Sequence, residues 1–265
     1  MTEKCAVIIT GASRGFGQAI ALAFAKSTNL GAKHYILTGR NPHGLKNTQA
    51  LILQIDNQAT FSTESFSFSD ASSLQHSVNT ILKHTEAYSR IYLINNAGSL
   101  GPMFTIGTHE YDTTEVIETV NANITSVCLL TNALVHQYLT KPTHNGLTVV
   151  NISSLAAIQP FSSKAIYCTG KAARDMYHRV LAEEQKDNKN NSIKVLNYAP
   201  GPLDTDMQTE IRESKTIDKN SQLAFINMKE KNQLVTCEAS ATKLLKLLST
   251  DTYESGAHLD YYDVE

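Results

Sequence analysis

Residues 5–26 read CAVIITGASRGFGQAIALAFAK, and they place a glycine-rich loop between an apolar run and an amphipathic stretch. The run predicts a buried strand and the stretch predicts a helix. Gly11, Gly15 and Gly17 let the loop turn tightly and approach a phosphate, and the following helix offers unpaired N–H groups and the positive end of its dipole. A glycine-rich loop alone could be only a tight turn. Here the strand before it and the helix after it open a βαβ unit, which predicts a dinucleotide site.

Short apolar runs alternate with amphipathic stretches along the whole 265-residue chain. Strands are expected at 5–10, 34–39, 60–69, 90–96, 147–153, 193–199 and 257–262, and helices at 17–26, 73–88, 126–139 and 239–249. This alternation is typical of a parallel sheet with helices on both faces, and several runs are apolar at successive positions, as in strands buried on both faces. The sequence therefore predicts the α/β class with a doubly wound (Rossmann) sheet of about seven strands, in a single domain spanning 1–265.

One segment interrupts the alternation of strands and helices. After NYAPGP (197–202) some thirty residues carry charges and weak helical periodicity, with no apparent strand. A long connection that leaves the carboxyl edge of a parallel sheet usually covers the ligand crevice. We therefore expect a substrate lid at about 203–234.

Composition and charge narrow the class of protein. With 42% hydrophobic and 18% charged residues the chain has an ordinary globular composition, and its net charge of −2 gives no reason to expect nucleic acid or a membrane as a partner. No apolar run reaches the roughly 20 residues of a membrane span, and the first residues lack the features of a signal peptide. The four cysteines are scattered and the histidines form no cluster, so we expect reduced thiols, no metal and a cytoplasmic protein.

The end of the second expected strand indicates which dinucleotide binds. NAD-binding folds place an acidic residue there to hold the ribose 2′-hydroxyl, whereas an arginine accommodates the 2′-phosphate of NADP. This chain has Arg40 and no carboxylate nearby, and Arg14 in the glycine-rich loop is a second cation. Either arginine alone could be an ordinary surface residue, but together they favour NADP (NADPH). Asp70, after the third strand, is expected to accept a hydrogen bond from the adenine amino group.

A possible catalytic set follows at the carboxyl ends of later strands. Ser154 comes directly after the fifth strand, and Tyr167 and Lys171 are four residues apart on an expected helix, which places them on one face. A carbonyl that accepts hydride needs a proton, which a tyrosine can donate. A nearby lysine ammonium should lower the pKa of the phenol, and the serine hydroxyl should donate a second hydrogen bond to the substrate oxygen. An isolated YxxxK pair is more often an ordinary exposed helix feature.

These motifs resemble those of the short-chain dehydrogenase/reductase family: TGxxxGxG at 10–17, NNAG at 95–98, serine at 154, YxxxK at 167–171 and PG at 200–201. The family's catalytic asparagine corresponds to Asn123, with Asn121 as a nearby alternative. In the family this asparagine helps to hold a water that relays protons to the lysine. Cofactor contacts implied by the predicted loops and by this resemblance are Gly11, Ser13, Arg14, Gly15, Phe16, Gly17, Arg40, Asn41, Asp70, Asn95, Ala97, Gly98, Tyr167, Lys171, Pro200, Leu203, Thr205 and Met207.

A narrower resemblance is to family members that reduce ketones on pterin side chains, the last reductions that lead to tetrahydrobiopterin. The similar segments are TGASRGFGQAI, INNAGSLG, NISSLAAIQPF, YCTGKAARDM, LNYAPGPLDTDMQ and SGAHLDYYD. The last implies that Asp260, rather than its neighbour Asp263, anchors the pterin through its paired N–H donors, and a carboxylate suits such donors. Substrate contacts implied by the resemblance are Ser154, Leu155, Tyr167, Gly201 and Asp260. The resemblance also implies a homodimer, formed by helices at 110–139 and 164–185.

Two other functions are compatible with the same motifs. A general NADPH carbonyl or diketone reductase of the same family would need no counterpart of Asp260. A non-catalytic NADPH-sensing protein typically lacks the tyrosine or the lysine, whereas this chain has Ser154, Tyr167 and Lys171. We therefore expect an NADPH-dependent reductase whose substrate is a pterin.

Overall fold

The computed structural model describes residues 4–141, 145–186 and 193–265. Seven strands in this part of the chain form one parallel sheet in the order β3-β2-β1-β4-β5-β6-β7. They are β1 (Lys4–Thr10), β2 (Ala32–Gly39), β3 (Thr60–Ser65), β4 (Arg90–Asn95), β5 (Gly146–Ile152), β6 (Ile193–Ala199) and β7 (His258–Asp260). The strand order reverses between β1 and β4, and such a switch point is where ligands bind in open α/β sheets.

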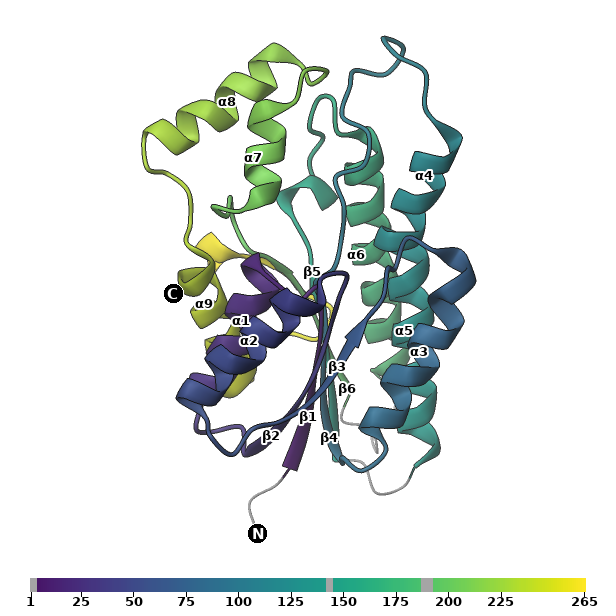
Figure 1. Cartoon of the computed structure of the whole chain (residues 1–265), viewed down its shortest axis with the longest axis vertical. Coiled ribbons are helices and arrows are strands. Elements are labelled where there is room, and N and C mark those ends of the chain that lie inside the picture. The colour runs from purple at the N-terminus through teal and green to yellow at the C-terminus, as the bar shows by residue number, and fades with distance from the viewer. Residues whose placement is uncertain (1–3, 142–144, 187–192) are drawn as a thin grey trace.

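Helices cover both faces of the sheet (Figure 1). One face carries α1 (Gly15–Lys26), α2 (Pro42–Ile55) and α9 (Cys237–Thr250), and the other carries α3 (Ala71–Thr85), α5 (Ser126–Thr140) and α6 (Ala165–Gln185). A short helix α4 (Thr113–Val120) and a π-helical turn at Asn121–Thr125 run directly into α5. The predicted fold class is therefore confirmed. None of the described helices is long and apolar enough to cross a membrane.

The hydrophobic core explains why the strands are apolar at successive positions. Along β1, Val7 and Ile9 pack with α1 and α9 on one face, while Ala6 and Ile8 pack with α3 and α5 on the other. All four side chains are fully buried. Because both faces of the strand are covered, neither can be polar.

The clearest differences from the expected elements are in three places. The helix α2 was not among the expected elements, although Asn41 caps it and Pro42 opens it. The third strand ends at Ser65 rather than at 69, because Asp70 already caps α3. The last strand ends at Asp260, whose side chain accepts from the Tyr262 N–H and caps a short 3-10 helix.

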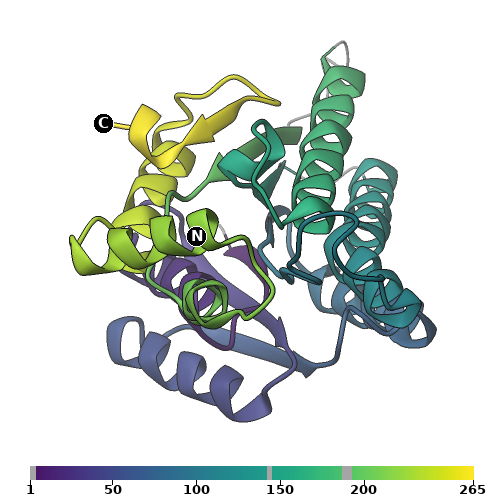
Figure 2. The same ribbon diagram turned by 90° about the horizontal axis from the view of Figure 1, so that it is seen from above.

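Residues 203–234 form two helices, α7 (Asp206–Glu213) and α8 (Lys219–Glu230). They lie beyond the carboxyl ends of the strands, as the views from the side and from above both show (Figures 1 and 2). A single parallel bridge between Leu203 and Val235 joins the two ends of this segment. The helices therefore stand over the edge of the sheet at which the glycine-rich loop lies.

Candidate active site

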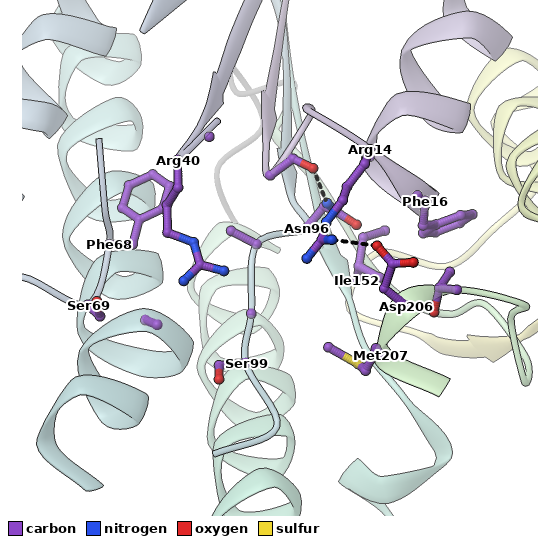
Figure 3. Close-up of a pocket in the computed structure, with 18 of the residues that line it drawn as sticks. Arg14, Phe16, Arg40, Phe68, Ser69, Asn96, Ser99, Ile152, Asp206 and Met207 are labelled. Atoms are coloured by element: carbon purple, nitrogen blue, oxygen red, sulfur yellow. Dashed lines mark hydrogen bonds and ion pairs between the residues drawn. The ribbon is translucent and has the colours of Figure 1, made fainter. Parts of the chain in front are cut away.

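A cleft of about 840 Å³ opens at the carboxyl ends of β1, β2, β4 and β5, beneath α7 (Figure 3). Of the sequence-predicted site residues, the following line it: Gly11, Ser13, Arg14, Gly15, Phe16, Gly17, Arg40, Asn41, Ala97, Gly98, Tyr167, Lys171, Pro200, Leu203, Thr205 and Met207. The following do not line it: Asp70, Asn95, Asn123, Ser154, Leu155, Gly201 and Asp260.

The glycine-rich loop has a backbone shape that side chains would prevent. Gly11 and Gly15 have φ angles of 70° and 56°, in the left-handed region that favours glycine. Gly17 lies so close to the preceding turn that a Cβ atom on it would come within 2.3 Å of the Gly11 carbonyl oxygen. Asn96, directly after β4, holds the loop, because its Nδ2 donates to the Thr10 carbonyl at 2.8 Å. This preformed loop, open to the cleft before helix α1, fits a phosphate group.

The two arginines expected to face a 2′-phosphate both line the cleft. Arg40 is exposed at the end of β2, where its neighbours Gly39 and Asn41 offer no carboxylate. Arg14 is also exposed, and its Nη1 lies 2.5 Å from Oδ2 of Asp206, at the start of α7 (Figure 3). An exposed ion pair of this kind contributes little stability, so a bound anion can replace the carboxylate at small cost.

Asp70 and Asn95 lie elsewhere than the sequence suggested. Asp70 is exposed, and its Oδ1 accepts from the Ser72 N–H at 3.0 Å as the cap of α3. Asn95 is buried below the cleft and donates to Thr131 Oγ1 at 2.9 Å. Because successive strand residues point to opposite sides, Asn96 rather than Asn95 faces the glycine-rich loop.

Tyr167 and Lys171 lie together on α6, with Lys171 Nζ 5.6 Å from the centre of the Tyr167 ring. Lys171 is buried, and its Nζ donates to the Ile152 carbonyl at 2.7 Å, at the end of β5. Ser154 follows β5 at the same edge and makes a side-chain hydrogen bond with Tyr167. The Ser154 Oγ also accepts from the Ala156 N–H at 3.1 Å, which fixes the side chain.

Burial shifts the pKa of both groups away from ionisation. The pKa of Tyr167 is raised by burial, although the Ser154 hydrogen bond and the Arg174 charge act in the opposite direction. Burial, followed by repulsion from Arg174, lowers the pKa of Lys171 well below its usual value of 10.5. The expected decrease in the pKa of the phenol is thus not observed, because burial outweighs the charges. A phenol that keeps its proton at neutral pH is nevertheless the form that can donate to a carbonyl oxygen.

The π-helical turn before α5 determines where two asparagines point. Asn123 is buried, with its Oδ1 accepting from the Ser99 N–H at 2.9 Å and its Nδ2 donating to the Ser99 carbonyl at 2.8 Å. Asn121 instead donates to the Ser69 carbonyl at 3.2 Å. Turns of this kind are frequent at functional sites. Asn123 is therefore the asparagine held between the loop after β4 and α6, where it packs against Gly170.

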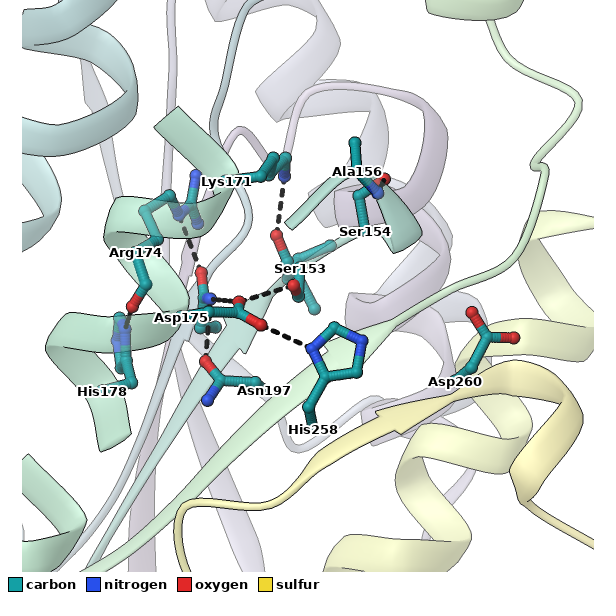
Figure 4. Close-up of polar contacts among 12 residues, drawn as sticks. Ser153, Ser154, Ala156, Lys171, Arg174, Asp175, His178, Asn197, His258 and Asp260 are labelled. Carbon is teal, nitrogen blue, oxygen red and sulfur yellow. Dashed lines mark hydrogen bonds and ion pairs between the residues drawn. The ribbon is translucent and has the colours of Figure 1, made fainter. Parts of the chain in front are cut away.

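A buried polar network lies directly behind the predicted catalytic residues, and sequence reasoning missed it (Figure 4). Arg174 donates through Nε to Asn151 Oδ1 at 2.7 Å and through Nη1 to the Ala97 carbonyl at 2.8 Å. Asp175 accepts from Asn151 Nδ2 at 2.9 Å and from Ser153 Oγ at 2.5 Å. The sequence of α6 could have indicated this network, because five polar residues share one face of the helix. They are Tyr167, Lys171, Arg174, Asp175 and His178.

Among the residues that the structure describes, no group of three or more histidine, cysteine or acidic side chains could hold a metal ion. The cleft combines a glycine-rich loop, two arginines, a tyrosine and a lysine, and Ser154 lies at the same sheet edge without lining the cleft. These features define an oxidoreductase that transfers hydride between a dinucleotide and a carbonyl or alcohol.

Comparison with known proteins gives the same class. The family model for short chain dehydrogenase matches residues 5–216. The chain therefore belongs to the short-chain dehydrogenase family, whose members are oxidoreductases that use nicotinamide cofactors.

Individual relatives show which proteins of known name this chain resembles. Sepiapterin reductase of Bos taurus is 38% identical over 260 residues, which cover 97% of this chain and 94% of that protein. Benzil reductase ((S)-benzoin forming) of Bacillus cereus is 31% identical over 252 residues, covering 94% of this chain and 96% of that protein. A crystal structure of a short-chain dehydrogenase/reductase from Saccharomyces cerevisiae superposes with a TM-score of 0.78 at 25% identity, covering 98% of this chain and 96% of that one.

Proposed function

We propose that the protein is an NADPH-dependent reductase of pterin side-chain ketones, with the activity of a sepiapterin reductase. The observation that carries the proposal is the position of Asp260. This half-buried carboxylate ends β7, at the same sheet edge as Ser154 and Tyr167, in a chain that is 38% identical over nearly its full length to sepiapterin reductase of Bos taurus.

Asp260 suits the recognition of a pterin ring. A 2-amino-4-oxo ring presents two neighbouring N–H donors, and a carboxylate accepts such a pair well. The Oδ1 atom of Asp260 already accepts from the Tyr262 N–H at 3.1 Å, which holds the carboxylate in one orientation. Within the described part of the chain its Oδ2 atom has no hydrogen-bond partner. The carboxylate therefore keeps acceptor capacity for a ligand.

Ser154, Tyr167 and Lys171 would carry out the proton chemistry of the reduction. NADPH supplies the hydride when it is bound. Ser154 and Tyr167 would donate hydrogen bonds to the substrate carbonyl oxygen, and the Tyr167 hydroxyl would give its proton to that oxygen as negative charge develops. The product is an alcohol, and Tyr167 is left as a phenolate. The Arg174 charge, which favours the ionised phenol, would stabilise that phenolate.

The cofactor preference rests on Arg14 and Arg40. Both line the cleft at the mouth of the glycine-rich loop, and the residues beside Arg40 offer no carboxylate for a ribose hydroxyl. A guanidinium pairs strongly with a phosphate and cannot accept from a hydroxyl. We therefore assign the 2′-phosphate of NADPH to these arginines, with Lys171 and Tyr167 at the nicotinamide ribose and 203–234 acting as the lid.

A homodimer is the second part of the proposal. Apolar side chains are exposed along one row of helices, where they would be costly in a monomer. They are Ile117 on α4, Leu129 and Leu139 on α5, and Met176 and Val180 on α6. The hydrogen bond from the Tyr177 hydroxyl to the Cys128 carbonyl joins α5 and α6 into one surface. Pairing of this surface with its copy would form a four-helix interface.

One alternative has a specific observation in its favour. The benzil reductase of Bacillus cereus is 31% identical over most of both chains, so reduction of an aromatic diketone is the second candidate activity. Measurement of NADPH oxidation with sepiapterin and with benzil distinguishes the two candidate activities. Efficient turnover of sepiapterin, with NADPH preferred over NADH, is the expected result. Turnover of benzil alone would leave the serine–tyrosine–lysine chemistry intact and exclude the pterin assignment.

A further inference from the structure

Asp175 and His258 form a buried link between the catalytic helix and the last strand (Figure 4). The Nδ1 atom of His258 lies 2.5 Å from Oδ2 of Asp175. Asp175 is on α6, four residues after Lys171, and only 8% of its side-chain surface is exposed. Its other carboxylate oxygen accepts from Asn151 on β5 and from Ser153 directly after β5, so the carboxylate itself cannot easily move.

His258 and Asp260 share one face of β7. In the register of the sheet His258 lies opposite Asn197 and Asp260 opposite Ala199. Residues two apart in a strand point to the same side, and both side chains are on the side of α6 (Figure 4). The position of Asp260 relative to Tyr167 and Lys171 thus depends on what holds this face of β7 to α6.

The strand itself gives Asp260 little support. β7 has three residues and pairs along one side, with β6. Short edge strands are weakly fixed by their backbone hydrogen bonds alone. On the opposite side Lys243 of α9 donates to the Tyr261 carbonyl at 3.1 Å, which holds the segment after the strand but not its α6 face.

We propose that His258 is a positioning residue, which through its hydrogen bond to Asp175 holds Asp260 at a fixed place relative to Tyr167 and Lys171 for pterin binding. The inference rests on the proposed function, because it assigns His258 to the substrate of that same site. His258 would contact neither the substrate carbonyl nor the cofactor, and its hydrogen bond to Asp175 would affect how tightly the pterin is bound.

The charges around His258 give this link a pH dependence. The carboxylates that act on it are Asp175 of α6 and Asp260 and Asp263 of the β7 segment, and together with the hydrogen bond to Asp175 they raise its pKa above 6.5 despite burial. Its Nε2 atom is enclosed and has no partner among the described residues. The link is therefore a charge-assisted pair at low pH and weakens as the pH rises through the pKa of His258.

The test compares His258→Leu, which removes the donor, with His258→Asn, whose amide can still donate to Asp175. With sepiapterin as substrate we expect His258→Leu to raise KM about 10-fold while kcat changes less than about 3-fold, and His258→Asn to recover most of the loss. In His258→Leu, the ratio of kcat/KM for sepiapterin to kcat/KM for benzil should fall as KM for sepiapterin rises. In the wild type KM for sepiapterin should rise with pH above neutral, and this dependence should be absent in His258→Asn.

A double variant separates positioning from a general structural role. If His258 acts through Asp260, His258→Leu should have no further effect on KM once Asp260→Asn has removed the anchor. Equal losses for sepiapterin and benzil, or a full additional loss in the double variant, would overturn the inference. An unchanged KM in His258→Leu, with Asp260→Asn still damaging, would overturn the inference alone. Failure of the wild type to reduce sepiapterin would overturn the proposed function and this inference with it.

Discussion

A Cβ atom on Gly17 would lie 2.3 Å from the carbonyl oxygen of Gly11 and 2.6 Å from Nδ2 of Asn96. The first turn of α1 is thus packed directly on the loop that precedes it, with no room for a side chain. Asn96 Nδ2 also donates to the Thr10 and Gly11 carbonyls, so the glycine-rich loop is held in its shape from both sides.

Replacement of Gly17 by alanine should therefore strongly weaken NADPH binding. The clash involves backbone atoms, so relief requires the loop to move away from the helix. Gly39→Ala is the matched control, because Gly39 lines the same cleft and its Cβ would meet nothing closer than 3.4 Å. We expect Gly17→Ala to weaken NADPH binding at least about 100-fold by calorimetry, and Gly39→Ala to bind within about 3-fold of the wild type. Equal affinities for the two variants would contradict this reading of the loop.

Arg40 should discriminate NADPH from NADH. Removal of a hydrogen bond to a charged group typically costs about 1.5–3 kcal/mol, so Arg40→Ala should raise KM for NADPH roughly 10- to 150-fold. KM for NADH should change little, because that cofactor lacks the 2′-phosphate. Steady-state kinetics with both cofactors measure the effect. Lys46→Ala is the control, because Lys46 is on the following helix α2 but does not line the cleft. A similar loss in Lys46→Ala would indicate a general charge effect.

His178 should make the protein less stable in mild acid. Burial lowers its pKa to about 4 from 6.5, and the side chain is fully enclosed. The unfolded chain therefore binds a proton more readily, and the free energy of unfolding falls as the pH drops from 6.5 towards 4, by about 3 kcal/mol in all. His258, whose pKa is raised, acts in the opposite direction over part of the range.

Denaturant unfolding of the wild type and His178→Gln at pH 7 and about pH 4.5 isolates this contribution. Between pH 7 and about pH 4.5, the free energy of unfolding should fall by about 2–3 kcal/mol less in His178→Gln than in the wild type. This difference does not depend on how stable the variant is at pH 7. The His258 contribution is common to both proteins and cancels. His76→Gln, which alters an exposed histidine on α3, should behave as the wild type. An unchanged pH dependence in His178→Gln would show that His178 does not titrate as its burial requires.

The apolar side chains exposed on α4, α5 and α6 should form the dimer interface. Met176 and Val180 are 54% and 46% exposed on α6. Replacement of both by glutamate should convert the dimer to a monomer in sedimentation velocity, because the charges would be buried unpaired at the interface. Leu223→Glu, at an equally exposed position on α8, should remain dimeric. A monomeric wild type, or an unaffected double variant, would contradict the proposed interface.

The parts of the site that follow from local sequence were predictable. The glycine-rich loop, the order of strands and helices, and the pairing of Tyr167 with Lys171 all depend on residues close together in the chain. The choice between Asn95 and Asn96 was not predictable, because it depends on where β4 ends and which side chain then faces the loop. The link from Asp175 to His258 was also missed, since it joins residues 83 apart in sequence. The spacing of polar residues on α6 was visible, but their partners were not.

Asp260→Asn tests the central claim most directly. Asparagine can still cap the 3-10 helix at 261–263, so the variant removes the charge of the anchor while keeping the local fold. The measurement is kcat/KM with NADPH for sepiapterin and for benzil. We predict efficient wild-type reduction of sepiapterin, and a loss of about 100-fold in the variant that is confined to sepiapterin, because a donor would then face the N–H groups of the pterin. Unchanged sepiapterin reduction in Asp260→Asn, or none in the wild type, would contradict the account.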